Sequence, residues 1–102
     1  MRKRLRRIKA TLINILYTND ELLDYLIGER VISEVDYQNI HAELTLNQKN
    51  SKLIDIIMRG SERNFQCFKD VLIYVQQGHV VKYIEKGLLS FHFLHYYKIC
   101  LY

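Results

Sequence analysis

The sequence contains no proline and only four glycines among its 102 residues. These two residues most often mark turns and loops, so their scarcity favours long helices with short joints. No apolar run reaches the roughly 18 uninterrupted residues that a membrane-spanning helix needs. With 49% apolar and 25% charged residues, the composition is typical of a folded domain and excludes a disordered chain.

Cysteine is also scarce. Cys67 and Cys100 are the two cysteines, too few for a disulfide framework, which favours a reducing, cytoplasmic compartment. The basic residues 1–9 are followed by a short, interrupted apolar run at 10–17. No small-residue cleavage site comes after it, so a signal peptide is not expected.

The sequence offers no catalytic constellation. Cys67 is expected to be a packed thiol, because no general base has a predictable position beside it. His92, His95 and Cys100 form an incomplete ligand set, since a closed zinc site needs four ligands. We therefore predict no metal, no other cofactor and no enzyme activity.

Apolar residues recur at helical spacing in six segments. The expected helices cover residues 2–16, 20–28, 34–44, 47–59, 62–76 and 79–86. The residues expected to face the core are Leu5, Ile8, Leu12, Ile15, Leu16, Leu22, Leu23, Leu26, Ile27, Tyr37, Ile40, Leu44, Phe65, Phe68, Leu72, Val75, Val80, Val81 and Ile84. The segment 47–59 is apolar nearly all round and is expected to be central. Residues 1–87 are predicted to form one compact all-α bundle.

Polar residues mark where several of these helices start. Thr18 followed by Glu21 matches a capping box for the second helix. Ser33 and Ser61 are expected to be N-caps of the third and fifth helices. Gly60 stands where a left-handed residue would end the fourth helix.

Gly87 is expected to end the last helix, and residues 88–102 differ in kind from the rest. Eleven of these fifteen residues are apolar or aromatic, and Lys98 carries the single formal charge. Three interpretations stay open for this hydrophobic tail: a seventh helix packed on the bundle, a contact with a membrane, and an appendage left by truncation of a longer gene product. The simplest expectation is a segment that is partly packed or disordered in isolation, and its aromatic residues would suit an interface or a partner groove.

The net charge of +4 is unevenly distributed. Residues 1–18 carry six bases and no acid, residues 19–46 carry seven acids and one base, and residues 47–102 carry eight bases and four acids. A chain with separate patches of opposite sign can bind its own copies head to tail. Opposed patches also accelerate association and fix its register.

The stretch K-L-I-D-I-I-M-R-G-S-E-R-N-F-Q-C-F-K-D-V-L, residues 52–72, joins an apolar helix to an arginine-glycine stop and a helix with two phenylalanines three residues apart. With D-E-L-L-D-Y-L-I-G-E-R-V-I-S (20–33) and Q-Q-G-H-V-V-K-Y-I (76–84), it resembles the caspase recruitment domain, a branch of the death-fold superfamily. The matching positions include Lys49, Leu53-Ile54-Asp55-Ile56-Ile57, Arg59-Gly60, Phe65 and Phe68. One basic residue precedes Gly60, where many members have two.

The resemblance implies a six-helix antiparallel Greek-key bundle that binds homotypically. In that family a basic face on the first and fourth helices meets an acidic face on the second and third helices of another domain. By position, the basic face would be Arg6, Arg7, Lys9, Lys49 and Lys52, and the acidic face would be Asp24, Glu29 and Asp36.

The resemblance also implies partners and a role. Family members assemble caspases, kinases or adaptors in apoptosis and inflammation, so the expected partners are other recruitment domains and copies of this chain. We expect a regulator or decoy consisting of little more than the domain. The alternative is a small basic nucleic-acid-binding helical domain, because residues 2–9 could contact phosphates. The acidic middle segment would repel a duplex, so nucleic acid is not an expected partner.

Overall fold

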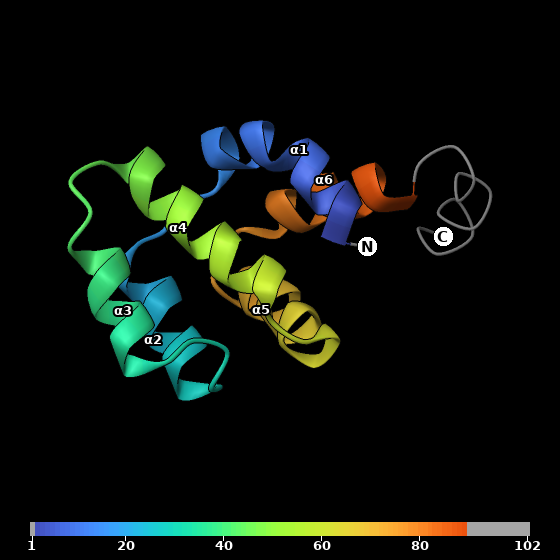
Figure 1. Ribbon diagram of the computed structural model, residues 1–102. Helices are drawn as coiled ribbons and strands as arrows, with labels where there is room; N and C mark the ends of the chain where they lie inside the picture. The colour runs from blue at the N-terminus through green and yellow to red at the C-terminus, as the bar shows by residue number, and fades with distance from the viewer. Residues whose placement is uncertain (1, 90–102) are drawn as a thin grey trace.

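The structure is a computed structural model that describes residues 2–89, with side chains for residues 8–86. Within that range the chain forms six α-helices and no strand (Figure 1). The helices are α1 (Arg2–Ile15), α2 (Asp20–Gly28), α3 (Glu34–His41), α4 (Leu46–Arg59), α5 (Glu62–Tyr74) and α6 (Gly78–Leu89). The predicted all-α fold and the order of its six helices are confirmed.

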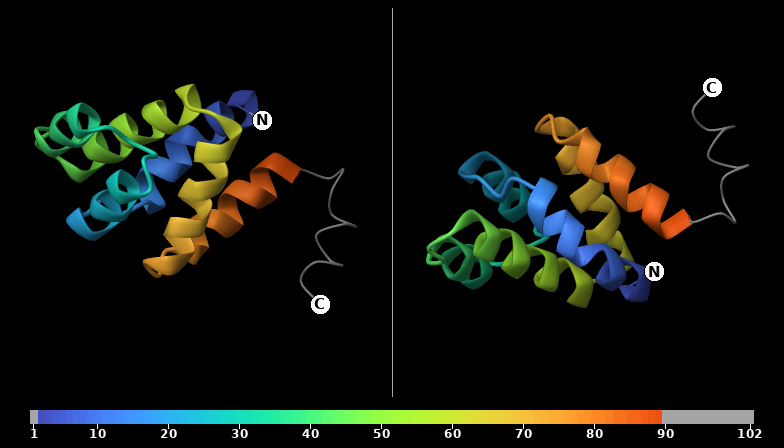
Figure 2. Two further views of the ribbon diagram at one scale, coloured as in Figure 1. Left: turned by 90° about the horizontal axis from the view of Figure 1, so that it is seen from below. Right: turned by 90° about the horizontal axis from the view of Figure 1, so that it is seen from above.

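The helices pack so that α1 and α2, although consecutive, have different neighbours. α1 lies alongside α4 and α6 and runs antiparallel to both (Figure 2). α2 packs on α5 and α3, and α3 packs in turn on α4. Helix α4, which was expected to be central, therefore contacts α1 on one side and α3 and α5 on others.

Among the side chains of residues 8–86, nineteen apolar ones form one continuous core. Every helix contributes, and the residues at 0% exposure include Leu22, Leu26, Ile40, Leu53, Leu72 and Ile84. Phe65 and Phe68 are buried as expected, and burial of each stabilises the fold by about 1.5–3 kcal/mol. The expected core residues Ile8, Ile15, Ile27 and Tyr37 pack against this core but are only partly buried. The side chain of Leu5 lies outside the described part.

The helix starts confirm two expected caps and correct a third. Ser33 and Ser61 accept hydrogen bonds from the backbone N–H groups of Asp36 and Asn64 at 3.1 and 3.0 Å. The expected capping box at Thr18 is wrong, because Asn19 is the N-cap of α2 and accepts from the Leu22 N–H at 2.9 Å. Thr18 is buried, and its hydroxyl oxygen has no hydrogen-bond partner within the described residues.

The helix ends differ more from the predictions. α3 ends at His41, and Leu44, expected in the core, is 92% exposed. Gly60 has extended backbone angles, so the expected left-handed stop is wrong there. Gly87 does not end α6, which continues to Leu89.

The left-handed conformation occurs instead at Arg30 and Gln76, which follow the C-caps of α2 and α5. At each of these two ends, two backbone N–H groups donate to carbonyl oxygens of the last helical turn, as in the Schellman motif. One N–H belongs to the left-handed residue and the other to the residue that follows it. The second of these bonds joins Val31 N–H to Leu26 O at 2.9 Å in α2, and Gln77 N–H to Leu72 O at 2.7 Å in α5. Neither of the two left-handed residues is a glycine.

The joint between α1 and α2 is held by side chains from the other end of the chain. Gln77 accepts a hydrogen bond from the Tyr17 N–H at 3.0 Å and donates to the Tyr17 carbonyl at 2.8 Å. The ring of His79, on α6, lies 3.1 Å from the Ile15 carbonyl oxygen through Nε2. These bonds fix the direction in which α2 leaves α1.

Candidate protein-interaction surfaces

The bases expected on α1 and α4 come from two helices that lie side by side. Lys9 of α1 forms an ion pair with Asp55 of α4, with 2.5 Å between Nζ and Oδ1. The two side chains are 26% and 40% exposed. The pairing offsets one of the positive charges that the sequence assigns to this side, and it also connects the two helices.

The other expected bases differ in their surroundings. Lys52 is exposed on α4, whereas Lys49 is half-buried. Lys49 lines a groove of about 310 Å³ between the α1–α2 joint and the α3–α4 joint, together with the exposed Leu44. Arg6 and Arg7 lie on α1, and their side chains are outside the described part.

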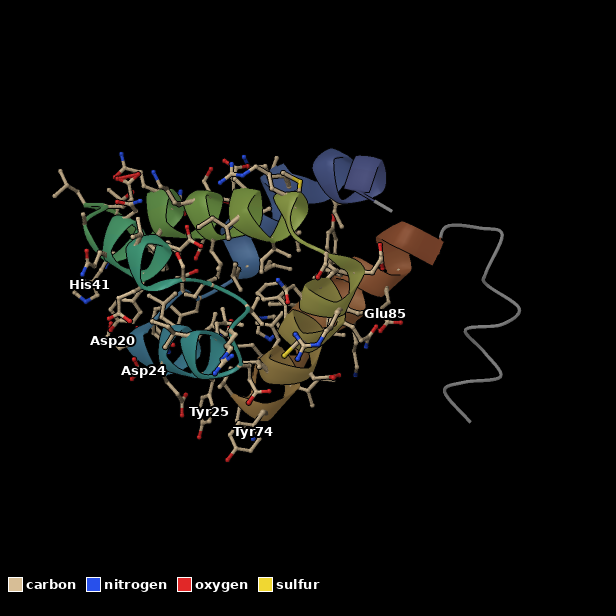
Figure 3. All side chains as sticks on the ribbon, turned by 60° about the horizontal axis from the view of Figure 1, so that its bottom comes forward. Asp20, Asp24, Tyr25, His41, Tyr74 and Glu85 are labelled. Carbon is tan, nitrogen blue, oxygen red and sulfur yellow. The ribbon has the colours of Figure 1, made fainter. Side chains whose placement is uncertain are left out.

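Three carboxylates gather around Tyr37, where α2 packs on α3. Burial raises the pKa of Tyr37, and the negative charges of Asp24, Asp20 and Glu34 raise it further. Asp20 also lies 3.3 Å from Nε2 of His41, whose ring stacks on Tyr37. Figure 3 shows Asp20 and Asp24 on the same end of the bundle as His41. This group is the negative side of the molecule.

Asp36 belongs to a helix cap. One of its carboxylate oxygens accepts a hydrogen bond from the Ser33 N–H at 3.1 Å and completes the capping box of α3. A carboxylate held this way stabilises the start of the helix. The Asp36 carboxylate therefore stabilises the N-terminus of its own helix, α3.

Glu29, the remaining expected acid, faces a different neighbour from Asp24. Its Oε1 lies 3.9 Å from the sulfur of Cys67 on α5. Five residues along a helix rotate a side chain by about 500°, so Asp24 and Glu29 point about 140° apart. The acids expected to form one face thus lie on two, one against α3 and one against α5.

The two charged sides are nevertheless separate. Helix α1 has α4 and α6 as its main neighbours, whereas α2 has α3 and α5. Figure 1 shows α4 running between α1 and the pair formed by α2 and α3. The pair of helices that carries the acids therefore lies on the side of α4 away from α1.

A family model for the caspase recruitment domain (CARD) matches residues 2–87. The chain belongs to the CARD family. No curated protein and no solved structure matches it. The all-α bundle of six helices described above is consistent with the death fold of CARDs.

CARDs are protein-interaction domains and not catalysts, and they bind other CARD-containing proteins homotypically. In this CARD, burial and then the charge of Glu29 raise the pKa of the Cys67 thiol, while Arg63 lowers it. The net effect keeps the sulfur protonated, which is the less reactive form. Cys67 packs against the core at partial burial, as the sequence predicts.

Two further findings concern the described residues alone. From residue 2 to residue 89, no group of three or more His, Cys, Asp and Glu side chains could hold a metal ion. In the same range, no helix has both the length and the apolar character needed to cross a bilayer. His92, His95 and Cys100 lie outside the described residues.

Sequence reasoning missed two features of the CARD surface. Arg59 is exposed on α4, seven residues after Lys52, and a spacing of seven places both on one stripe of the helix. That spacing could have added Arg59 to the basic side. Asp20 was counted among the acids but not assigned to the acidic face, and its contact with His41 depends on the packing of α2 against α3.

Proposed function

We propose that this CARD assembles with copies of itself and with other CARDs through two surfaces of opposite charge. The basic surface comprises Arg6, Arg7 and Lys9 on α1 with Lys49, Lys52 and Arg59 on α4. The acidic surface is centred on Asp24, with Asp20 and Glu34 beside it. The main support is the clustering of these three carboxylates around Tyr37, on the side of α4 away from α1.

The magnitudes favour an assembly of many weak contacts. One exposed ion pair contributes about 0–1 kcal/mol, so several pairs must act together to hold two domains. Opposed patches also steer the encounter and reject like-charged orientations. A surface of each sign on every copy leads to head-to-tail addition.

We further propose a regulatory or decoy role for this CARD in cytoplasmic apoptotic or inflammatory assemblies that recruit caspases. The support is an asymmetry between the two surfaces. Lys9 is already paired with Asp55 on the basic side. On the acidic side Asp20 contacts His41, whereas Asp24 and Glu34 form no ion pair within the described residues. A domain that binds better through one surface than through the other would cap a growing assembly.

The test uses charge reversal and sedimentation velocity at low salt. We expect Asp24→Lys, and separately Arg6→Glu with Arg7→Glu, to prevent self-association, and a mixture of the two proteins to recover a 1:1 complex. Glu29→Lys changes the charge equally but on the α5 side, so it is the matched control and should associate like the wild type. If either charge-reversed protein alone forms the wild-type oligomer, the two-surface mechanism is wrong.

The decoy role has its own measurement. Substoichiometric wild-type protein should shorten filaments of a partner CARD that polymerises alone, and the Asp24→Lys protein should not. Longer or more numerous filaments would instead indicate that this CARD nucleates assembly.

A further inference from the structure

A groove of about 370 Å³ lies on the α2–α5 side of the CARD, away from the acids around Tyr37. Tyr25 and Tyr74 stand together at it, with ring centroids 4.8 Å apart in an edge-to-face arrangement. Figure 3 shows both rings pointing away from the bundle. Tyr74 is 64% exposed and Tyr25 is 39% exposed. Two adjacent exposed tyrosines, with Val71 and Cys67 beside them, form an apolar surface typical of a binding site.

The rim of this groove is acidic. Glu29 and Asp70 line it, and Glu21 is close enough to raise the pKa of Tyr25, after the larger effects of hydrogen bonding with Tyr74 and of burial. Arg63 is a base whose charge lowers the pKa of the Cys67 thiol. The residues that line the groove include two acids and no base, which favours a ligand that is apolar or aromatic and carries positive charge.

The same chain contains a segment of that chemistry. Residues 90–102 include no acid, and Lys98 is their single formal charge, with His92 and His95 as further bases. Their aromatic residues are Phe91, Phe93, Tyr96, Tyr97 and Tyr102. Thirteen extended residues span about 43 Å. That reach exceeds twice the length of α6, whose twelve residues measure about 18 Å.

We propose that residues 90–102 bind the groove between α2 and α5 of their own molecule, with aromatic side chains against Tyr25 and Tyr74 and Lys98 near Glu29 or Asp70. The position at which residues 90–102 begin, directly after α6, favours this segment as the occupant of the groove. Helix α5 packs on both α6 and α2, so the end of α6 lies within the reach of the segment from the groove. A second copy docking groove to groove would place acid against acid, which is unfavourable.

A bound tail would have a consequence for assembly. It would cover Glu29, one of the acids that the family resemblance implies for the interaction face, and leave Asp24 on the α3 side uncovered. The tail and the charged surfaces of the proposed function could then act independently. Loss of tail binding would therefore appear in a cross-linking assay without a change in sedimentation.

The experiment places the photo-cross-linker p-benzoylphenylalanine at position 97 of the full chain. After irradiation and proteolysis, mass spectrometry should find cross-links to α2 and α5 peptides within one molecule. A mixture of isotope-labelled and unlabelled chains separates these from cross-links between molecules. The double variant Tyr25→Ala with Tyr74→Ala should lose the α2 and α5 cross-links at least about fivefold, and Tyr17→Ala, which removes an exposed tyrosine elsewhere, should keep them.

A second variant tests the charges without removing an aromatic ring. Glu29→Lys with Asp70→Lys should reduce the same cross-links about two- to fivefold, as expected for exposed ion pairs. Circular dichroism checks that each variant is folded. Cross-links to other helices, cross-links only between molecules, or a yield unaffected by the two tyrosines would each overturn the proposal.

Discussion

Asn50 on α4 holds the backbone of Thr18 in the joint between α1 and α2, with its Oδ1 accepting the Thr18 N–H at 3.1 Å. Its Nδ2 donates to the carbonyl oxygens of Leu16 at 2.6 Å and Ile13 at 2.8 Å. The side chain is fully buried. One amide thus satisfies three backbone groups at the point where the basic first helix gives way to the acidic second helix.

Replacing Asn50 with leucine should destabilise the CARD strongly. The change keeps the size of the side chain but leaves one N–H and two carbonyls without this partner, and each buried polar group left unpaired costs about 1–3 kcal/mol. We expect a loss of about 2–5 kcal/mol in the free energy of unfolding, measured by urea denaturation. Asn47→Leu, an exposed asparagine on the same helix, should change it by about 0.5 kcal/mol or less. Equal effects of the two changes would show that the Asn50 bonds contribute little.

The corrected cap of α2 gives a second pair of variants. Asn19→Ala should lower the free energy of unfolding by about 0.5–2 kcal/mol, because it removes the acceptor for the Leu22 N–H. Thr18→Val replaces a buried hydroxyl that has no partner within the described residues with a methyl group of similar shape, and should be neutral or stabilising. The capping box expected from the sequence predicts the opposite ranking, so thermal melts of the two proteins decide between them.

The fold was predictable because apolar periodicity reports directly which face of a helix is buried. The stripe Phe65, Phe68 and Leu72 is an example, since all three are in the core. Helix ends were less predictable because they depend on tertiary packing. Thr18 has the right residue type for a cap, but the chain buries it, and the left-handed conformation occurs at Gln76 without a glycine.

The candidate site was predictable as a set of charges and not as a geometry. Counting by segment assigned the bases and the acids to different helices, but it could not show that Lys9 is paired with Asp55 across two helices. Helical rotation alone would have separated Asp24 from Glu29. The contact between Tyr25 and Tyr74 joins residues far apart in the chain, and no local pattern predicts it.

Cys67 should react slowly with alkylating agents. Burial and then Glu29 raise the pKa of its thiol, and the thiolate is the reactive form. The pH–rate profile for iodoacetamide, followed by mass spectrometry of the Cys67 peptide, should therefore have its midpoint at higher pH in the folded chain than in urea. A raised folded-state pKa also means that this contribution to stability is complete below the unfolded pKa and is lost as pH rises through the folded pKa.

The Glu29 charge can be tested separately in the same assay. Glu29→Gln should move the midpoint to lower pH by removing the second-largest cause of the shift. Glu62→Gln, which removes an exposed acid from α5, is the control and should leave the midpoint in place. A midpoint that is the same in the folded and unfolded chains would contradict the raised pKa.

Removing the partner of Lys9 should strengthen assembly. Asp55→Asn leaves the Lys9 ammonium without the carboxylate that it contacts at 2.5 Å, so the basic surface gains one positive charge. We expect the dissociation constant for self-association to fall about two- to fivefold at low salt, as expected for one more exposed ion pair. Sedimentation equilibrium measures it, and the same exposure limits the loss of folding stability to about 1 kcal/mol or less.

Asp70→Asn is the control for Asp55→Asn, because it changes the net charge equally at the groove between α2 and α5, away from the surface formed by α1 and α4. An equal gain in both proteins would mean that overall net charge, and not the position of Lys9, sets the affinity. No gain in Asp55→Asn would remove Lys9 from the basic surface. The difference between the two proteins should also disappear near 1 M salt, where the screening length falls to about 3 Å. A difference that persists there would have to come from packing between the helices.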